Sequence, residues 1–229
     1  MPTAGDDVTG FDAGPPEPLP AARVAVIVAH PDDETLWAGG LLLSHPEWSP
    51  TIVTLCRGDD LDRAPRFRRA LACLRAQGAM GTLDDGPDQL PLDTGSVQDA
   101  ILALLPEREY DLLLTHGPEG EYTWHRRHTE VSLAVRALWR DGRLRARSLW
   151  QFAYEDGRGT HAPKPQPGAS FELLLPEAVW AQKYGIITGA YGFDAASWEA
   201  RAATRTEAFH CFKDPAAIAP AMVSQGIQP

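Results

Sequence analysis

The chain has 229 residues, of which 44% are hydrophobic and 23% charged, and this composition excludes fibrous, collagen-like and wholly disordered proteins. At roughly 150 residues per domain, the length fits one large domain with short additions at its ends. Acidic residues outnumber basic ones 31 to 21, and the net charge is −10. Such a surface repels a phosphate backbone, which argues against nucleic acid as a general partner.

The three cysteines are odd in number and widely spaced, which excludes a disulfide framework or a zinc finger. We expect Cys56, Cys73 and Cys211 to be buried apolar side chains in a reducing compartment. The N-terminal sequence lacks the basic and apolar regions of a signal peptide, and every apolar run is shorter than the about 20 residues that span a bilayer. We therefore expect a cytoplasmic protein without a membrane span.

Composition shifts along the chain predict one folded domain between two less regular ends. Residues 1–21 are rich in proline, glycine and aspartate and are expected to form a flexible arm. Residues 214–229 are small and mostly apolar and are expected to form a loosely docked tail. The folded domain is then residues 22–213.

Strand-like and helix-like patterns alternate within this domain. In chain order, they predict a strand at 23–30, a helix at 35–44 with a closely packed glycine pair, a strand at 51–57, a helix at 66–77 capped by Gly78, a helix at 96–107, a strand at 110–117, a helix at 129–140, strands at 148–155 and 170–175, and a helix at 178–187. This alternation predicts an α/β fold, with a Rossmann-like, mainly parallel sheet and helices on both faces. The dinucleotide fingerprint GxGxxG does not follow the first strand. In such sheets, ligands bind beyond the carboxyl ends of the strands.

The first strand runs directly into His30, Pro31, Asp32, Asp33 and Glu34. Proline and acidic residues also favour the first turn of a helix, so a purely structural role is one interpretation. A histidine does not stabilise the first turn of a helix, however, so a purely structural role does not explain His30. A histidine followed at once by paired carboxylates makes a compact set of nitrogen and oxygen ligands.

A second group of histidines follows the strand at 110–117. His116 ends that strand, and a glycine-rich loop then leads to His125 and His128, which one helical turn places on the same face. An isolated pair at this spacing is also common on surfaces and in cores. Because two such groups meet at one edge of the predicted sheet, we favour a metal site. Imidazole and carboxylate without thiolate suit Zn²⁺, and Fe²⁺, Co²⁺ or Mn²⁺ less exclusively, and two histidines with one aspartate leave a position for water, as in hydrolytic zinc enzymes.

The string AHPDDE after a buried strand, with His-x-x-His after a later one, resembles the LmbE-like or PIG-L deacetylases over roughly residues 23–190. These are zinc-dependent enzymes with a Rossmann-like fold that remove N-acetyl groups from compounds containing N-acetylglucosamine. The resemblance implies that His30, Asp33 and His128 are the zinc ligands and that Asp32 is the general base.

The same resemblance implies roles for residues around the second motif. His125 would stabilise the tetrahedral intermediate, and either His125 or protonated Asp32 would protonate the leaving amine. Tyr122 is a candidate oxyanion contact, although it stands three residues before the motif where the family more often has two. The motif itself reads HRRH where the family usually has HPDH, which keeps both histidines and changes the residues between them.

Substrate contacts are expected from three further loops. Arg57, Arg63 and Arg66 occupy a loop similar to the Arg- and Asp-rich segment that helps to hold the sugar in this family, although a solvated charged loop has the same composition. Asp85 is a candidate for contact with sugar hydroxyls or an ordinary turn residue. Trp124 is a candidate aromatic wall, whereas Trp37 is expected in the core. The arginines would form a cationic rim suited to an anionic group near the sugar.

These features predict a hydrolase with one Zn²⁺ per chain that removes the N-acetyl group from a small amino-sugar substrate. A metal-dependent amidase for a non-sugar amide is the first alternative. A non-catalytic sugar-binding module is the second, and it is disfavoured because simple binding needs no spare carboxylate beside the ligands. The oligomeric state stays open.

Overall fold

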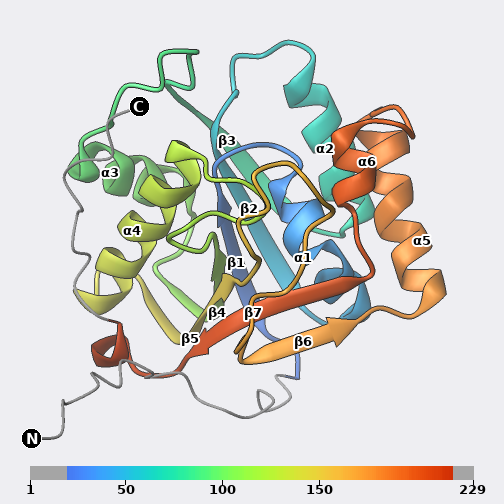
Figure 1. Cartoon of the computed structure of the whole chain (residues 1–229). Helices are drawn as coiled ribbons and strands as arrows, with labels where there is room; N and C mark the ends of the chain where they lie inside the picture. The colour runs from blue at the N-terminus through green and yellow to red at the C-terminus, as the bar shows by residue number, and fades with distance from the viewer. Residues whose placement is uncertain (1–19, 219–229) are drawn as a thin grey trace, which may run out of the picture.

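The computed structural model describes residues 20–218, so most of the expected arm and tail lies outside the described residues. One seven-stranded sheet, in the order β3-β2-β1-β4-β5-β7-β6, forms the centre of the domain (Figure 1). Its strands are β1 (Arg23–Val28), β2 (Ser49–Cys56), β3 (Gln77–Leu83), β4 (Glu109–Thr115), β5 (Arg145–Phe152), β6 (Phe171–Leu174) and β7 (Thr206–Phe212). The helices are α1 (Asp33–Ser44), α2 (Arg63–Cys73), α3 (Thr94–Leu104), α4 (Arg126–Arg140), α5 (Glu177–Gly185), the π-helix η1 (Ile186–Ala190), α6 (Trp198–Ala202) and the 3₁₀-helix η2 (Pro215–Ala217).

The expected α/β fold with a mainly parallel sheet is confirmed. The strands from β3 to β5 pair in parallel, while β7 is antiparallel to both of its neighbours, β5 and β6. The chain builds outward from β1 through β2 to β3, and then returns to place β4 on the other side of β1. The strand order therefore reverses between β1 and β4, and a ligand crevice is expected beyond the carboxyl ends of these two strands.

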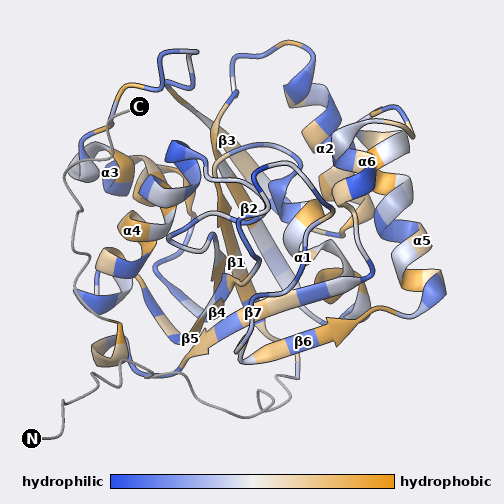
Figure 2. Cartoon of the chain, viewed as in Figure 1, coloured by the Kyte–Doolittle hydropathy of each residue, from blue (hydrophilic) through white to orange (hydrophobic). Residues whose placement is uncertain are grey.

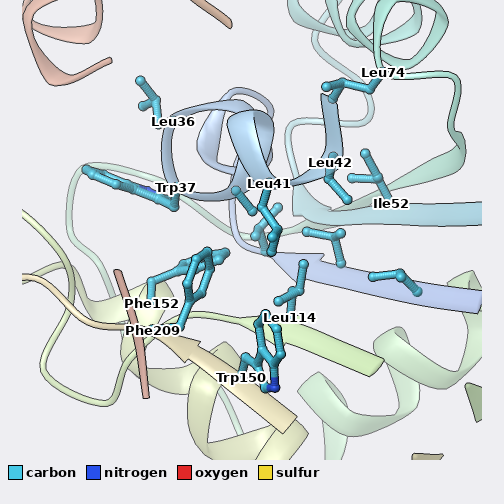
Figure 3. Close-up of a cluster of buried hydrophobic side chains, with 14 of the residues drawn as sticks. Leu36, Trp37, Leu41, Leu42, Ile52, Leu74, Leu114, Trp150, Phe152 and Phe209 are labelled. Atoms are coloured by element: carbon cyan, nitrogen blue, oxygen red, sulfur yellow. The ribbon is translucent and has the colours of Figure 1, made fainter. Parts of the chain in front are cut away.

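Both faces of the sheet are buried, which explains the continuous apolar runs of its central strands. Val24, Val26 and Val28 of β1 join one core cluster with side chains of α1 and α2, while Ala25 and Ile27 join the other with side chains of α3 and α4. Figure 3 shows the first cluster, and Figure 1 shows α3 and α4 on one side of the sheet and α1, α2, α5 and α6 on the other. The central strands are accordingly hydrophobic while the helices are mixed (Figure 2).

The helix expected at 66–77 is shorter than predicted, because α2 ends at Cys73 and the edge strand β3 begins at Gln77. Gly78 caps no helix. A Cβ atom at this position would lie 2.2 Å from the carbonyl oxygen of Ile52, so the glycine lets β3 approach β2. The sequence QGAMGTL hides this strand, because its two glycines have low β propensity. The strand β7 was also not predicted.

Further expectations are confirmed or corrected at single positions. The expected close packing of the α1 glycine pair is confirmed, because a Cβ at Gly40 would lie 2.3 Å from the side chain of Leu175. The helix expected at 178–187 divides into α5 and the π-helix η1. All three cysteines are free, and Cys56 and Cys211 are buried, but Cys73 at the end of α2 is exposed, contrary to expectation. At the start of the expected tail, Ile218 is buried in the second core cluster.

Within residues 20–218, no helix is both long enough and apolar enough to cross a membrane.

A buried ion pair joins α1, α5 and β7. The ammonium group of Lys183 donates to Glu207 Oε1 at 2.7 Å, and both side chains are fully buried. Glu207 also accepts the backbone N–H groups of Gly40 and Leu41, each at 2.7 Å. The carboxylate is therefore paired with one cation and two amides, which is what burial of a charge requires.

We predict that Lys183→Met lowers the free energy of unfolding by about 3–5 kcal/mol, because it leaves the buried Glu207 carboxylate without its cation. Chemical denaturation measures this change. Lys164→Met, at an exposed lysine, is the matched control and should leave stability unchanged. Equal stability of the two variants would contradict a stabilising role of the Lys183–Glu207 pair.

Candidate functional site

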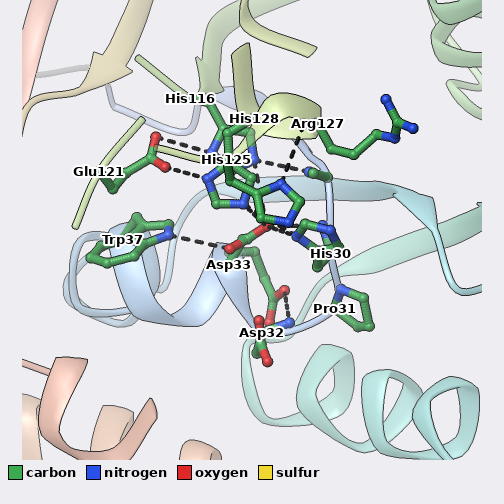
Figure 4. A network of polar contacts seen from close by, with 12 residues as sticks. His30, Pro31, Asp32, Asp33, Trp37, His116, Glu121, His125, Arg127 and His128 are labelled. Atoms are coloured by element: carbon green, nitrogen blue, oxygen red, sulfur yellow. Dashed lines mark hydrogen bonds and ion pairs between the residues drawn. The ribbon is translucent and has the colours of Figure 1, made fainter. Parts of the chain in front are cut away.

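The loops after β1 and β4 bring two histidines and one aspartate together at the point where the strand order reverses (Figure 4). His30 Nδ1 lies 3.2 Å from His128 Nε2. Asp33 Oδ2 lies 3.3 Å from His30 Nδ1 and 3.4 Å from His128 Nε2. The three atoms thus form a nearly equilateral triangle, and these are the residues that the sequence predicts as metal ligands.

Local structure fixes each member of this triangle. His30 follows β1, and its backbone N–H donates to Asp33 Oδ2 at 2.9 Å. Asp33 is the first residue of α1, and its other oxygen, Oδ1, accepts from the indole N–H of Trp37 at 3.3 Å. Trp37 is buried in the core, as expected, and also orients the carboxylate. His128 lies in the first turn of α4, which begins directly after His125.

A tetrahedral zinc ion fits these three donors. Two ligands that are each about 2.0–2.1 Å from such an ion lie about 3.3 Å apart, which matches all three distances. The outward ring nitrogens of both histidines face carboxylates, so in the neutral rings they carry the proton. The inward nitrogens of His30 and His128 then point lone pairs at one another and at Asp33. Such a cluster of lone pairs is stabilised by a cation.

Burial alone would raise the pKa of Asp33, but the charges of His128 and His116 outweigh burial and hold this pKa well below its ordinary value. Asp33 is therefore ionised, as a metal ligand must be.

Other donors near this triangle are less suitable as ligands. His116 Nε2 lies 3.5 Å from Asp33 Oδ2, but it accepts a hydrogen bond from the backbone N–H of Ala29 at 2.9 Å, so its lone pair is already used. Cys56 lies near His30 and Asp85. Burial raises the pKa of Cys56 to about 12, so the thiolate form that binds metals is disfavoured.

His128 is held from behind by Glu121, which the sequence did not predict as a site residue. Glu121 Oε2 accepts from His128 Nδ1 at 2.6 Å, and Oε1 accepts from His116 Nδ1 at 3.0 Å and from the Gly117 N–H at 3.1 Å (Figure 4). Burial would raise the pKa of Glu121, but the charges of His116 and His128 lower it to about 2. A buried carboxylate that orients a ligating histidine tunes both the geometry and the basicity of the ligand. The only sequence signal for Glu121 was its position in the loop between two histidine motifs.

The ligand His30 has its own carboxylate partner, Asp85. His30 Nε2 lies 3.3 Å from Asp85 Oδ1, and Asp85 also binds Gln89 Nε2 at 2.9 Å and Arg57 Nη2 at 2.6 Å. The sequence predicts Asp85 and Arg57 as substrate contacts; in the structure, Asp85 lies against His30, and Arg57 pairs with Asp85. Of the two, only Arg57 has an exposed side chain.

Asp32 lies beside the triangle without belonging to it. Its Oδ2 accepts from Arg63 Nη1 at 2.9 Å, so this predicted substrate arginine contacts the predicted base. Burial, and then the charge of Asp33, raise the pKa of Asp32 well above its ordinary value, against the opposing effect of Arg63. A carboxylate with a raised pKa is a stronger proton acceptor.

His125 supplies a neutral hydrogen-bond donor next to the ligands. Its ring centroid lies 4.7 Å from that of His30 and 4.9 Å from that of His128. Burial, followed by the charges of His128 and His30, lowers the pKa of His125 to about 4. Its Nδ1 accepts from the Arg127 N–H at 3.3 Å, so the proton of the neutral ring is on Nε2.

Three other predicted site residues lie farther from the triangle. Arg66 binds the Tyr191 carbonyl and pairs with Asp62 at 2.9 Å, rather than projecting as a free cation. Tyr122 packs edge-to-face on Trp198 with ring centroids 5.1 Å apart, and it belongs to the core cluster. The structure therefore gives no support to an oxyanion contact by Tyr122. Trp124, directly before His125, is 53% exposed.

The two arginines inside the second motif have different environments. Arg126 lies over the ring of Trp124, 5.6 Å from its centroid. Arg127 is buried, pairs with Glu130, and donates to the Leu90 carbonyl at 2.8 Å and to the Asp84 carbonyl. Arg127 thus fastens the loop that carries Asp85 to the start of α4.

Comparison with known proteins identifies one family and several structures with the same fold. The sequence profile of the PIG-L family, described as GlcNAc-PI de-N-acetylase, matches residues 25–139, about half of the chain. No curated protein matches the chain by sequence. Among solved structures, the A40926 pseudoaglycone deacetylase Dbv21 covers 84% of this chain and 98% of its own at 15% identity, with a TM-score of 0.57.

Two further structures share this fold, and one of them has a different activity. A complex of a deacetylase from teicoplanin biosynthesis with teicoplanin covers 74% of this chain and 86% of its own at 17% identity, with a TM-score of 0.56. The 4-carboxy-2-hydroxymuconate hydratase GalB of Pseudomonas putida KT2440 covers 82% and 94% at 16% identity, with a TM-score of 0.55. At these identities the likeness establishes the fold alone, and the fold supports more than one reaction.

We predict that Glu121→Gln weakens zinc binding by about 10- to 100-fold, because the amide no longer offers two acceptor oxygens to the histidines behind the site. Competition with a chromogenic chelator measures this affinity. Glu119→Gln changes an exposed glutamate of the same loop and serves as the control. Equal zinc affinity of both variants and the parent would contradict the role assigned to Glu121.

Proposed function

The chain belongs to the PIG-L family, and we propose that it is a zinc-dependent hydrolase that removes the N-acetyl group from a small molecule or glycoconjugate containing N-acetylglucosamine. The observation that carries the proposal is the triangle of His30 Nδ1, Asp33 Oδ2 and His128 Nε2, with sides of 3.2–3.4 Å, next to a spare carboxylate. The triangle would hold one zinc ion per chain. When bound there, zinc supplies Lewis-acid polarisation of the amide carbonyl and acidifies a water molecule.

Asp32 has the properties of the general base. It adjoins the ligand Asp33, it is mostly buried, and its pKa is raised by burial and by the charge of Asp33. In the proposed reaction Asp32 takes a proton from the attacking water as the C–O bond forms. When the C–N bond breaks, Asp32 returns this proton to the nitrogen, and acetate and a free amine leave.

His125 is proposed to stabilise the tetrahedral intermediate. Its pKa of about 4 keeps the ring neutral near pH 7, and its Nε2–H is a hydrogen-bond donor. A neutral donor suits a developing oxyanion, because it needs no change of its own protonation state. The same neutrality makes His125 a poor acid, so we assign protonation of the leaving amine to Asp32.

The substrate end of the site is proposed to be formed by Trp124 together with the exposed part of Arg57. Trp124 is exposed directly before His125, and the guanidinium group of Arg126 lies over its ring. The remaining predicted arginines offer little to an anionic group, because the guanidinium groups of Arg63 and Arg66 already bind protein oxygens. We therefore propose contact with the sugar face rather than recognition of a nearby anion.

The direct test is acetate release from a panel of N-acetylglucosamine conjugates, with and without a chelator. The proposal requires release that the chelator abolishes and zinc restores. Release that the chelator does not affect would contradict a metal-dependent reaction. Zinc-dependent cleavage of non-sugar amides alone would support the amidase alternative.

We predict that substitutions of the two adjacent carboxylates distinguish the general base from the metal ligand. Asp32→Asn should retain zinc while acetate release falls by about 10²- to 10⁴-fold, which is the usual contribution of a positioned general base. Asp33→Asn should lose zinc affinity, as should His128→Ala. Elemental analysis combined with the acetate assay measures both effects. Loss of zinc in Asp32→Asn, with zinc retained in Asp33→Asn, would mean that Asp32 is the ligand and Asp33 the base.

We predict that Trp124→Ala raises KM for the sugar substrate about 3- to 10-fold, because it removes the aromatic wall from the sugar face. Zinc content should not change. Leu174→Ala removes a comparably exposed apolar side chain from β6 and is the control. An unchanged KM for Trp124→Ala would remove this residue from the substrate site.

A further inference from the structure

A segment near the C-terminal end of the domain, Ala190–Phe193, contacts the surroundings of Asp32. It begins at the last residue of the π-helix η1 and lies outside residues 25–139, which match the family profile. π-Helical turns are rare and occur frequently at functional sites. Two side chains of this segment approach Asp32 by separate routes.

The first route runs from Tyr191 through Glu34. The Tyr191 hydroxyl donates to Glu34 Oε1 at 2.7 Å, and Glu34 Oε2 accepts the backbone N–H of Asp32 at 3.0 Å. Both side chains are fully buried, and the Thr35 hydroxyl adds a third donor at 2.6 Å. Removing one donor from a fully buried carboxylate leaves it under-satisfied, so the position of Glu34 depends on Tyr191.

The backbone of Asp32 needs such support. Asp32 has φ = 113° and ψ = −29°, a conformation that residues other than glycine rarely adopt. Its carbonyl accepts the N–H groups of Thr35 and Leu36, both at 2.9 Å, which begins α1. Glu34 accepts the backbone N–H of the same residue. A strained residue persists only where its surroundings fix it, and Glu34 is part of that restraint.

The second route runs from Phe193 through Arg63. The Arg63 guanidinium lies over the Phe193 ring, 5.1 Å from its centroid, and donates to Asp32 Oδ2 at 2.9 Å. The segment is in turn fastened to α2, because Arg69 donates to the Ala190 carbonyl at 2.8 Å and Arg66 donates to the Tyr191 carbonyl. Contacts that start from Ala190–Phe193 therefore restrain both the backbone and the side chain of Asp32.

We propose that Ala190–Phe193 is a positioning element for the general base, and that Tyr191 is its principal residue and acts through Glu34. This inference rests on the proposed assignment of Asp32 as the base. It adds a contribution from the second half of the chain, where the sequence motifs gave no sign of one.

The test is the variant Tyr191→Phe, which keeps the ring and removes the hydroxyl. We expect kcat for acetate release to fall about 10- to 100-fold, in the range expected for a misplaced catalytic group. KM and zinc affinity should be unchanged, because neither the substrate wall nor the ligand triangle contacts Tyr191. Tyr184→Phe, in the preceding helix α5, is the matched control and should retain full kcat.

A double-mutant cycle tests whether Tyr191 acts through Asp32. In the Asp32→Asn background, Tyr191→Phe should cause no further loss of kcat, because the group that it positions is already absent. Full additivity, or unchanged kcat in the single variant, would overturn the proposal. Loss of zinc affinity in Tyr191→Phe would also overturn it, since the hydroxyl would then support the whole site. Phe193→Leu offers a second, milder variant and should lower kcat in the same selective way.

Amide hydrogen exchange in the metal-free protein gives a readout that needs no substrate. Tyr191→Phe should accelerate exchange at the Asp32 amide and leave the amides of β1 unchanged, and equal exchange in parent and variant would contradict the inference. If the parent releases no acetate from any conjugate, the proposed function fails, while the exchange measurement still decides whether Tyr191 restrains Asp32.

Discussion

One carboxylate oxygen, Asp33 Oδ2, organises the site. It lies within 3.5 Å of ring nitrogens from His30, His116 and His128, and it accepts the backbone N–H of His30. This is possible only because β4 returns to pair with β1, so that His30 and His128, 98 residues apart in the chain, meet at the same edge. His30 and His128 are each backed by a carboxylate, which leaves their inward lone pairs for a cation.

The sequence predicted the central strands and the proximity of His30, Asp33 and His128 for the same reason. Apolar β-branched runs indicate strands buried on both faces, and the residues that follow such strands must lie at the ligand-binding edge. The partners behind the ligands were not predictable in this way. Glu121 and Asp85 are acidic residues in loops, and only the folded path of the backbone shows which histidine each one meets. The strand β3 was missed because its glycines serve a close backbone approach that local propensity does not report.

The arginines show how burial changes the interpretation of a charged loop. Sequence alone suggested a cationic rim for an anionic substrate group. In the structure, Arg57 pairs with Asp85, which lies against His30, and Arg63 pairs with Asp32, next to Asp33. Arg127 is buried and joins the loop that carries Asp85 to the start of α4. These cations thus offset the negative charge of a site that contains several buried acids, which an overall charge of −10 does not reveal. The exposed Trp124 is left as the principal candidate surface for a sugar.

X-ray absorption at the zinc edge, on protein loaded with one equivalent of zinc, tests the central claim most directly. A metal held by His30, Asp33 and His128 predicts a first shell of nitrogen and oxygen at about 2.0–2.1 Å with scattering from two imidazoles. A sulfur shell at about 2.3 Å would place the metal at Cys56 instead, in the set with His30 and Asp85. Scattering from three imidazoles would indicate His125 in place of Asp33. Either result would contradict the account, and a two-imidazole shell without sulfur would support it.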